Sequence, residues 1–253
     1  PADAAGPRCC AGGWSARGRG ADGGRGREPG ARGRGGHSMG PFIALAGAQA
    51  HGDKLDGLVL CGSDYHPPLY YRLMAALLKW QRRRHGARGQ SPLVHKLTFE
   101  AWARSVPDAR TDFDWLSADP AQVKAYIDDP KCGFQCTTAT WLALLSGLAD
   151  VQSAKGLSRL PARLPILLLG GRQDPMSGGG KGMDRLQQAL SRRRLPVERM
   201  DCPRGRHEIL NDFCAPEVRQ TLLELSLIHH RRCRRIERLR IRQAAKRHTR
   251  ENQ

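Results

Sequence analysis

Two short apolar runs constrain the fold of this chain most. Residues 55–63 (LDGLVLCGS) and 164–171 (LPILLLGG) are bounded by Gly and Pro and lack the alternation of a half-exposed strand. Such runs are typical of strands buried on both faces of a parallel sheet. A third strand-like run lies at 197–202, and helical patterns occupy 183–194 and 216–230. Strands that alternate with helices predict an α/β fold with a mostly parallel sheet.

Residues 64–155 interrupt this alternation. They hold helix-like stretches at 69–80, 111–134 and 137–151, and a basic loop is expected at 81–89. An insertion between two sheet strands predicts a helical cap over the carboxyl edge of the sheet, where open α/β sheets bind ligands.

A serine between two glycines precedes the first apolar run. Ser38 stands in the pattern Gly-x-Ser-x-Gly. A nucleophile elbow needs small residues at Gly36 and Gly40, because larger side chains would collide with the sheet and the following helix. The small apolar residues that follow predict a buried helix with Pro41 in its first turn. By itself the motif is a weak signal in a Gly-rich segment, and the alternative is an ordinary loop serine.

An acid and a histidine follow the later strands. Asp174 comes just after the strand at 165–171, and His207 comes after the strand at 197–202. Serine needs an imidazole to take its proton, and a carboxylate must hold that imidazole in the right tautomer. The order Ser, Asp, His is that of the α/β-hydrolase triad. Taken singly, each residue is better explained as a turn acid or a loop histidine, but the three in order favour a triad.

Several separate motifs occur in one order: GHSMG with FIA, GLVLCGS, TDFDWLSAD, YIDDPKCGF, LPILLLGGRQDP and RHEILND. Together they resemble the serine aminopeptidase/lysophospholipase group of α/β-hydrolases, the monoacylglycerol-lipase-like bacterial hydrolases, over residues 36–226. The resemblance implies that Ser38 is the nucleophile, Asp174 the triad acid and His207 the base. It also implies that the Met39 backbone N–H is one oxyanion donor.

The same resemblance implies a mobile helical cap at 64–155 and a serine hydrolase that cleaves carboxylic esters through an acyl-enzyme. The implied substrates are small ester or lipid molecules of the lysophospholipid or monoacylglycerol type. Neither a cofactor nor a metal is expected. The peptidase in the family's name is not evidence for peptide cleavage.

The first 35 residues depart from the family pattern. Members carry several strands, a His-Gly-type loop with a second oxyanion donor and an apolar strand before the nucleophile, whereas residues 1–35 contain no apolar run. We therefore expect a disordered Gly/Arg-rich leader. Residues 36–228 would then form a partial hydrolase domain, the second half of the fold, in a truncated or frame-disrupted hydrolase. A catalytically inactive remnant is the alternative.

Most of the positive charge lies at the two ends. Of the formal charge of +18, residues 1–37 carry +4, residues 229–253 carry +8, and the rest carry only +6. Arg-rich segments can bind nucleic acid through phosphate contacts, which gives a second alternative function. Trp14 is the only aromatic residue for base stacking in either segment. Solvated tails are therefore favoured, and the basic C-terminal tail at 229–253 could prolong the last helix.

The cysteines and the apolar runs bear on the compartment. The eight cysteines include no CxxC pair, which favours reduced thiols. The apolar runs are far shorter than the ~20 residues that a membrane-spanning helix needs, and residues 1–30 lack the apolar core of a secretory signal. A cytoplasmic protein is expected.

No metal site is predicted, because His229, His230 and Cys233 lack a further ligand.

Overall fold

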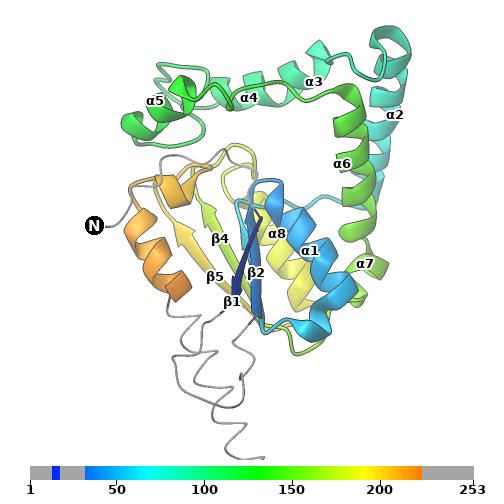
Figure 1. Cartoon of the computed structure of the whole chain (residues 1–253), viewed down its shortest axis with the longest axis vertical. Helices are drawn as coiled ribbons and strands as arrows, with labels where there is room; N and C mark the ends of the chain where they lie inside the picture. The colour runs from blue at the N-terminus through cyan, green and yellow to red at the C-terminus, as the bar shows by residue number, and fades with distance from the viewer. Residues whose placement is uncertain (1–12, 18–31, 224–253) are drawn as a thin grey trace, which may run out of the picture.

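The computed structural model describes residues 13–17 and 32–223, which form a five-stranded sheet with helices on both faces and a helical insertion (Figure 1). The order in the sheet is β1-β2-β3-β4-β5. β1 runs antiparallel to β2, and the other pairs are parallel, so the prediction of a mostly parallel sheet is confirmed. The strands are β1 (Gly13–Arg17), β2 (Arg32–His37), β3 (Gly57–Cys61), β4 (Ile166–Gly171) and β5 (Val197–Cys202).

Helices α1 (Gly40–His51) and α8 (Lys181–Ser191) cover one face of the sheet. Their buried side chains join alternate residues of β3 and β4 in the larger apolar cluster. The short turn η1 (Gly52–Lys54) leads from α1 toward β3. The intervening residues of β3 and β4 face the other side, against η2 (Ile209–Asn211) and a helix over residues 215–223, orange in Figure 1. The expected helix at 216–230 is thus present up to 223, and its remainder lies outside the described residues.

Two strands lie within the segment expected to be disordered. Residues 13–17 form β1, and residues 32–35 belong to β2, which pairs in register with β3 from Gly33 opposite Gly57 to His37 opposite Cys61. The expectation that residues 1–35 hold no strand is therefore wrong at these positions. The ladder with β3 overrides the poor β-propensity of glycine, a tertiary effect that no local pattern reveals. The rest of that segment, like 229–253, lies outside the described residues.

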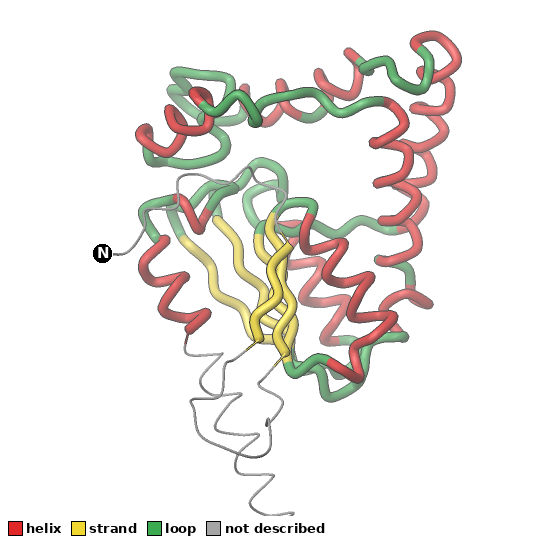
Figure 2. Tube along the Cα trace, viewed as in Figure 1, coloured by secondary structure: helices red, strands yellow, loops and turns green. Residues whose placement is uncertain are grey.

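The residues between β3 and β4 form helices and loops only (Figure 2). α2 and α6 pack side by side through an apolar cluster, and α3, α4 and α5 extend from them over the sheet (Figure 1). The loop expected at 81–89 is wrong for 81–85, because α2 continues to His85 and buries Gln81, and ends at Gly86 with φ of 75°. The helices are α2 (Pro68–His85), α3 (Pro92–Leu97), α4 (Phe99–Arg104), α5 (Pro120–Asp128), α6 (Thr138–Val151) and α7 (Ala154–Ser158).

A disulfide joins Cys202, the last residue of β5, to Cys214 at a sequence separation of 12. The expectation of reduced thiols is wrong for this pair. The chain folds back after β5 and brings the two Cα atoms to 6.3 Å, within the range that a disulfide spans. Every helix within residues 13–17 and 32–223 is too short or too polar to cross a lipid bilayer.

Candidate active site

Ser38 lies in a sharp turn between β2 and α1. Its φ is 60°, a left-handed conformation that non-glycine residues rarely adopt, and its N–H donates to the Cys61 carbonyl at 3.1 Å. A Cβ on Gly36 would lie 2.2 Å from the backbone carbon of Gly40. The strand and the helix therefore meet so closely that only glycine fits at position 36, as the elbow motif requires.

Met39 is the N-cap residue of α1, and it has no side-chain hydrogen bond to the helix. Pro41 stands in the first turn as expected, and that turn contains no acidic residue. The first N–H groups of a helix have no partner within it and favour a negative charge nearby. The strained serine therefore sits at a helix N-terminus that can stabilise an anion.

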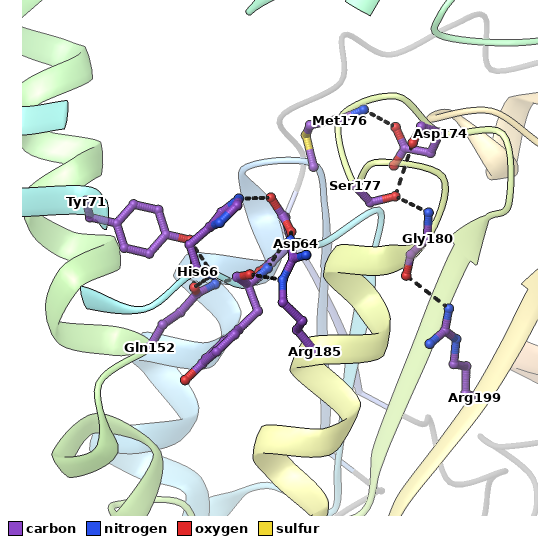
Figure 3. Close-up of polar contacts among 11 residues, drawn as sticks. Asp64, His66, Tyr71, Gln152, Asp174, Met176, Ser177, Gly180, Arg185 and Arg199 are labelled. Atoms are coloured by element: carbon purple, nitrogen blue, oxygen red, sulfur yellow. Dashed lines mark hydrogen bonds and ion pairs between the residues drawn. The ribbon is translucent and has the colours of Figure 1, made fainter. Parts of the chain in front are cut away.

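Asp174 and His207 form a buried pair. Asp174 lies in the loop after β4 and His207 in the loop after β5, and each is 1% exposed. The Oδ2 of Asp174 is 3.2 Å from Nδ1 of His207, while its Oδ1 accepts from the Met176 N–H at 2.9 Å. Figure 3 shows how the loop that carries Asp174 closes through Ser177, whose hydroxyl donates to the Asp174 carbonyl and accepts from the Gly180 N–H.

The contact lowers the pKa of Asp174 and raises the pKa of His207, and both changes favour the charged forms. Burial alone would raise the pKa of Asp174, but the charge and hydrogen bond of His207, with the Met176 N–H, lower it below its usual value. Burial alone would lower the pKa of His207, but the charge and hydrogen bond of Asp174, with the charge of Glu208, raise it above its usual value. The carboxylate thus orients an imidazole that takes up a proton readily.

The Nε2 atom of His207 faces no hydrogen-bond partner among the described residues. The Ser38 hydroxyl therefore does not donate to it in this structure. Ser38 is nevertheless close, because the preceding residue, His37, places Nε2 3.0 Å from the His207 carbonyl and its ring 4.8 Å from the His207 ring. The structure brings Asp174 and His207 into contact and sets Ser38 one residue from a side chain that contacts His207.

The insertion reaches the same site through Trp115. The His207 N–H donates to the Trp115 carbonyl at 3.3 Å, and the two rings lie 5.3 Å apart. The indole Nε1 of Trp115 is buried without a hydrogen-bond partner among the described residues. Sequence reasoning missed Trp115, His37 and Glu208. The last two adjoin Ser38 and His207 in the chain, a signal that could have found them.

A polar cluster fixes the base of the insertion to the core (Figure 3). Gln152, which is fully buried, accepts from the Tyr71 hydroxyl at 2.7 Å and donates to the Asp64 carbonyl at 2.6 Å. The Asp64 carboxylate pairs with His66 at 2.8 Å and with Arg185 of α8 at 3.3 Å. These contacts tie both ends of the insertion to α8.

Within residues 13–17 and 32–223, no group of three or more His, Cys, Asp or Glu side chains is arranged to hold a metal ion.

The fold is that of known hydrolases. A carboxyl esterase from Bacillus coagulans, solved with glycerol, is 25% identical with a TM-score of 0.67, over 76% of this chain and 62% of that one. A Paleococcus ferrophilus monoacylglycerol lipase is 24% identical with a TM-score of 0.53, over 77% of this chain and 67% of that one. A soluble variant of Saccharomyces cerevisiae monoglyceride lipase is 17% identical with a TM-score of 0.54, over 78% of this chain and 61% of that one.

The chain spans less than two thirds of the length of that esterase, at 62%. Among curated protein sequences, none matches it significantly. The family model described as serine aminopeptidase, S33, matches residues 27–213, which include the serine elbow, the insertion and the Asp174–His207 pair. The chain therefore belongs to the serine aminopeptidase S33 family and has an α/β-hydrolase fold.

Proposed function

We propose that the protein is a serine hydrolase that cleaves carboxylic esters, with Ser38 as nucleophile, His207 as base and Asp174 as the acid that orients His207. The observation that carries this proposal is the buried Asp174–His207 pair. Nε2 of His207 has no hydrogen-bond partner among the described residues, and the His207 backbone contacts His37, the residue before Ser38. A neutral imidazole held at Nδ1 by a carboxylate has Nε2 available to accept the serine proton.

The proposed reaction has two steps. Ser38 Oγ attacks the ester carbonyl while its proton passes to Nε2 of His207, and the Met39 N–H at the start of α1 stabilises the oxyanion. His207 then returns the proton to the leaving alcohol. In the second step His207 takes a proton from water, and the resulting hydroxide oxygen attacks the acyl carbon. The bond between the acyl carbon and Ser38 Oγ then breaks, His207 gives the proton to Oγ, and the acid leaves.

The proposed substrates are small esters of the monoacylglycerol or lysophospholipid type. The similarity to a carboxyl esterase supports an ester rather than a peptide. Apolar residues of α2 and α6 pack together at the base of the insertion, and a second cluster around Trp115 lies beside His207. An acyl chain suits such surroundings better than a charged group does.

A fluorophosphonate probe tests the proposal directly, because it reacts with an activated serine whatever the true substrate is. We expect the folded protein to be labelled at Ser38, and Ser38→Ala and His207→Ala to lose the label. Ser15, which lies in β1, gives a control variant, Ser15→Ala, that should be labelled like the wild type. A folded wild-type protein that takes no label would support an inactive remnant instead.

A panel of p-nitrophenyl esters of increasing acyl length, followed by a monoacylglycerol and a lysophospholipid, then identifies the substrate class. Hydrolysis of short esters alone would reject the lipid assignment while leaving the serine mechanism intact.

A further inference from the structure

A buried carboxylate beside His207 has no part in the proposed reaction. Glu208 is 6% exposed, and its Oε2 accepts from the Asn211 side chain at 3.2 Å. Its Oε1 has no hydrogen-bond partner among the described residues, and it lies 3.5 Å from Nδ1 of His37. A buried carboxylate costs free energy unless a donor or a positive charge faces it. His37 is therefore the side chain that makes this position tolerable for Glu208.

His37 joins the two halves of the site. It is the last residue of β2, directly before Ser38, and it is 6% exposed. Its Nε2 lies 3.0 Å from the His207 carbonyl. Because a carbonyl oxygen only accepts hydrogen bonds, Nε2 of His37 carries a hydrogen. The other ring nitrogen, Nδ1, faces Glu208 at 3.5 Å, and it can donate to that carboxylate only in the protonated ring, in which both nitrogens carry hydrogen. In that form the carboxylate holds the ring from the side opposite its contact with His207.

We propose that Glu208, acting through His37, is a positioning residue that holds the His207 loop against the Ser38 elbow. This inference rests on the proposed function. Glu208 reaches the proposed base in two ways, through the hydrogen bond that His37 makes to the His207 carbonyl and through its own negative charge. Neither requires Glu208 to contact the substrate.

The charge of Glu208 acts on two groups around it. It adds to the effects of Asp174 that raise the pKa of His207 against burial. After burial itself, it is also the main cause that raises the pKa of the Cys61 thiol. The other titratable or charged groups around this site are Asp174 after β4, His37 of β2, Cys61 of β3, and Arg206 and Asp212 on the chain segment that carries His207.

The near-isosteric variant Glu208→Gln removes the charge and little volume. We expect the pH profile of fluorophosphonate labelling to change, with its acid limb moved to lower pH, because the pKa of His207 falls when a neighbouring negative charge is lost. We also expect the plateau rate to fall about tenfold, because the base is less well placed. Glu198→Gln, an identical change at an exposed residue of β5, should give a profile that superimposes on that of the wild type.

Variants of His37 separate the hydrogen bond from the charge. His37→Gln keeps an amide donor for the His207 carbonyl, and we expect its labelling rate to fall about tenfold. His37→Leu keeps no donor, and we expect a fall of about 10²-fold. Because Glu208 acts through His37, adding Glu208→Gln to His37→Leu should lower the plateau no further. If His37→Leu does not fold, Glu208→Gln alone decides the question.

The outcomes distinguish this inference from the proposed function. A wild-type protein without labelling would reject the proposed function. A labelled wild type with an unchanged Glu208→Gln profile would overturn the positioning role and leave the serine mechanism standing. A lower plateau with an unmoved acid limb would also overturn it, because a merely structural residue has that effect.

Discussion

The two strands on either side of β3 support the site in different ways. All six residues of β4, ILLLGG, are buried, and its leucines pack into the clusters on both faces of the sheet. β2, RGRGGH, contributes no aliphatic side chain and pairs with β3 through its backbone. Asp174 therefore follows an apolar strand, whereas Ser38 follows a strand that depends on close backbone contact. The part of the site on β4 should therefore be sensitive to the removal of side-chain volume. The part on β2 should be sensitive to added volume.

The largest effect is expected from adding side-chain volume on β2. In Gly36→Ala the new Cβ would meet the backbone of Gly40 at 2.2 Å, so the elbow cannot close and labelling of Ser38 should be abolished. Gly33→Ala is the matched control, because a Cβ there meets nothing within 4 Å. Equal labelling of the two variants would show that the elbow tolerates a wider approach.

Removing volume from β4 should cost stability. Leu168 is fully buried among residues of α1, β3 and α8, and Leu168→Ala should lower the free energy of unfolding by about 2–5 kcal/mol. Ile43 of α1 is 56% exposed, so Ile43→Ala should change it by less than about 0.5 kcal/mol. Urea unfolding followed by circular dichroism measures both. Similar losses would mean that burial in this apolar cluster does not determine the cost of removing a side chain.

The pH dependence of stability should belong to the Asp174–His207 pair. The lowered pKa of Asp174 gives stability that is lost as pH falls through its folded value, below about 3.9. The raised pKa of His207 gives stability that is lost as pH rises through its folded value, above about 6.5. Wild type and Asp174→Asn should therefore differ most in mildly acidic solution, as urea midpoints at a series of pH values would show. Ser38→Ala should follow the wild type throughout.

The smallest effect is expected at the base of the insertion. Arg185 holds the Asp64 carboxylate and the Tyr65 carbonyl from a half-exposed position, and Arg185→Ala should lower the unfolding free energy by about 1 kcal/mol or less. Its effect on labelling should be small. Thermal unfolding at low and high salt gives the check, and a large loss of labelling would show that this contact also positions the site.

The apolar strands β3 and β4 could be predicted from the sequence, whereas the glycine-rich strand β2 could not. The runs at 55–63 and 164–171 contain β3 and β4, because continuous burial leaves a local signature. β2 leaves none, since its order comes from the neighbouring strand rather than from its own side chains. The positions of Asp174 and His207 after strands were also visible in the sequence. The approach of Trp115 to His207 was not, because it depends on how an insertion of about ninety residues folds back.

The disulfide between Cys202 and Cys214 closes a ring of backbone that contains His207. A cross-link of this span removes conformational freedom from the unfolded chain, an effect of about 3 kcal/mol for a loop of similar length in the chain-entropy description. Even an unfolded molecule would then keep the residues from Cys202 to Cys214 closed into a ring. Part of the entropy of ordering the His207 loop would be lost when the thiols oxidise rather than when the sheet assembles, so the redox state of the surroundings would set part of the stability of this loop.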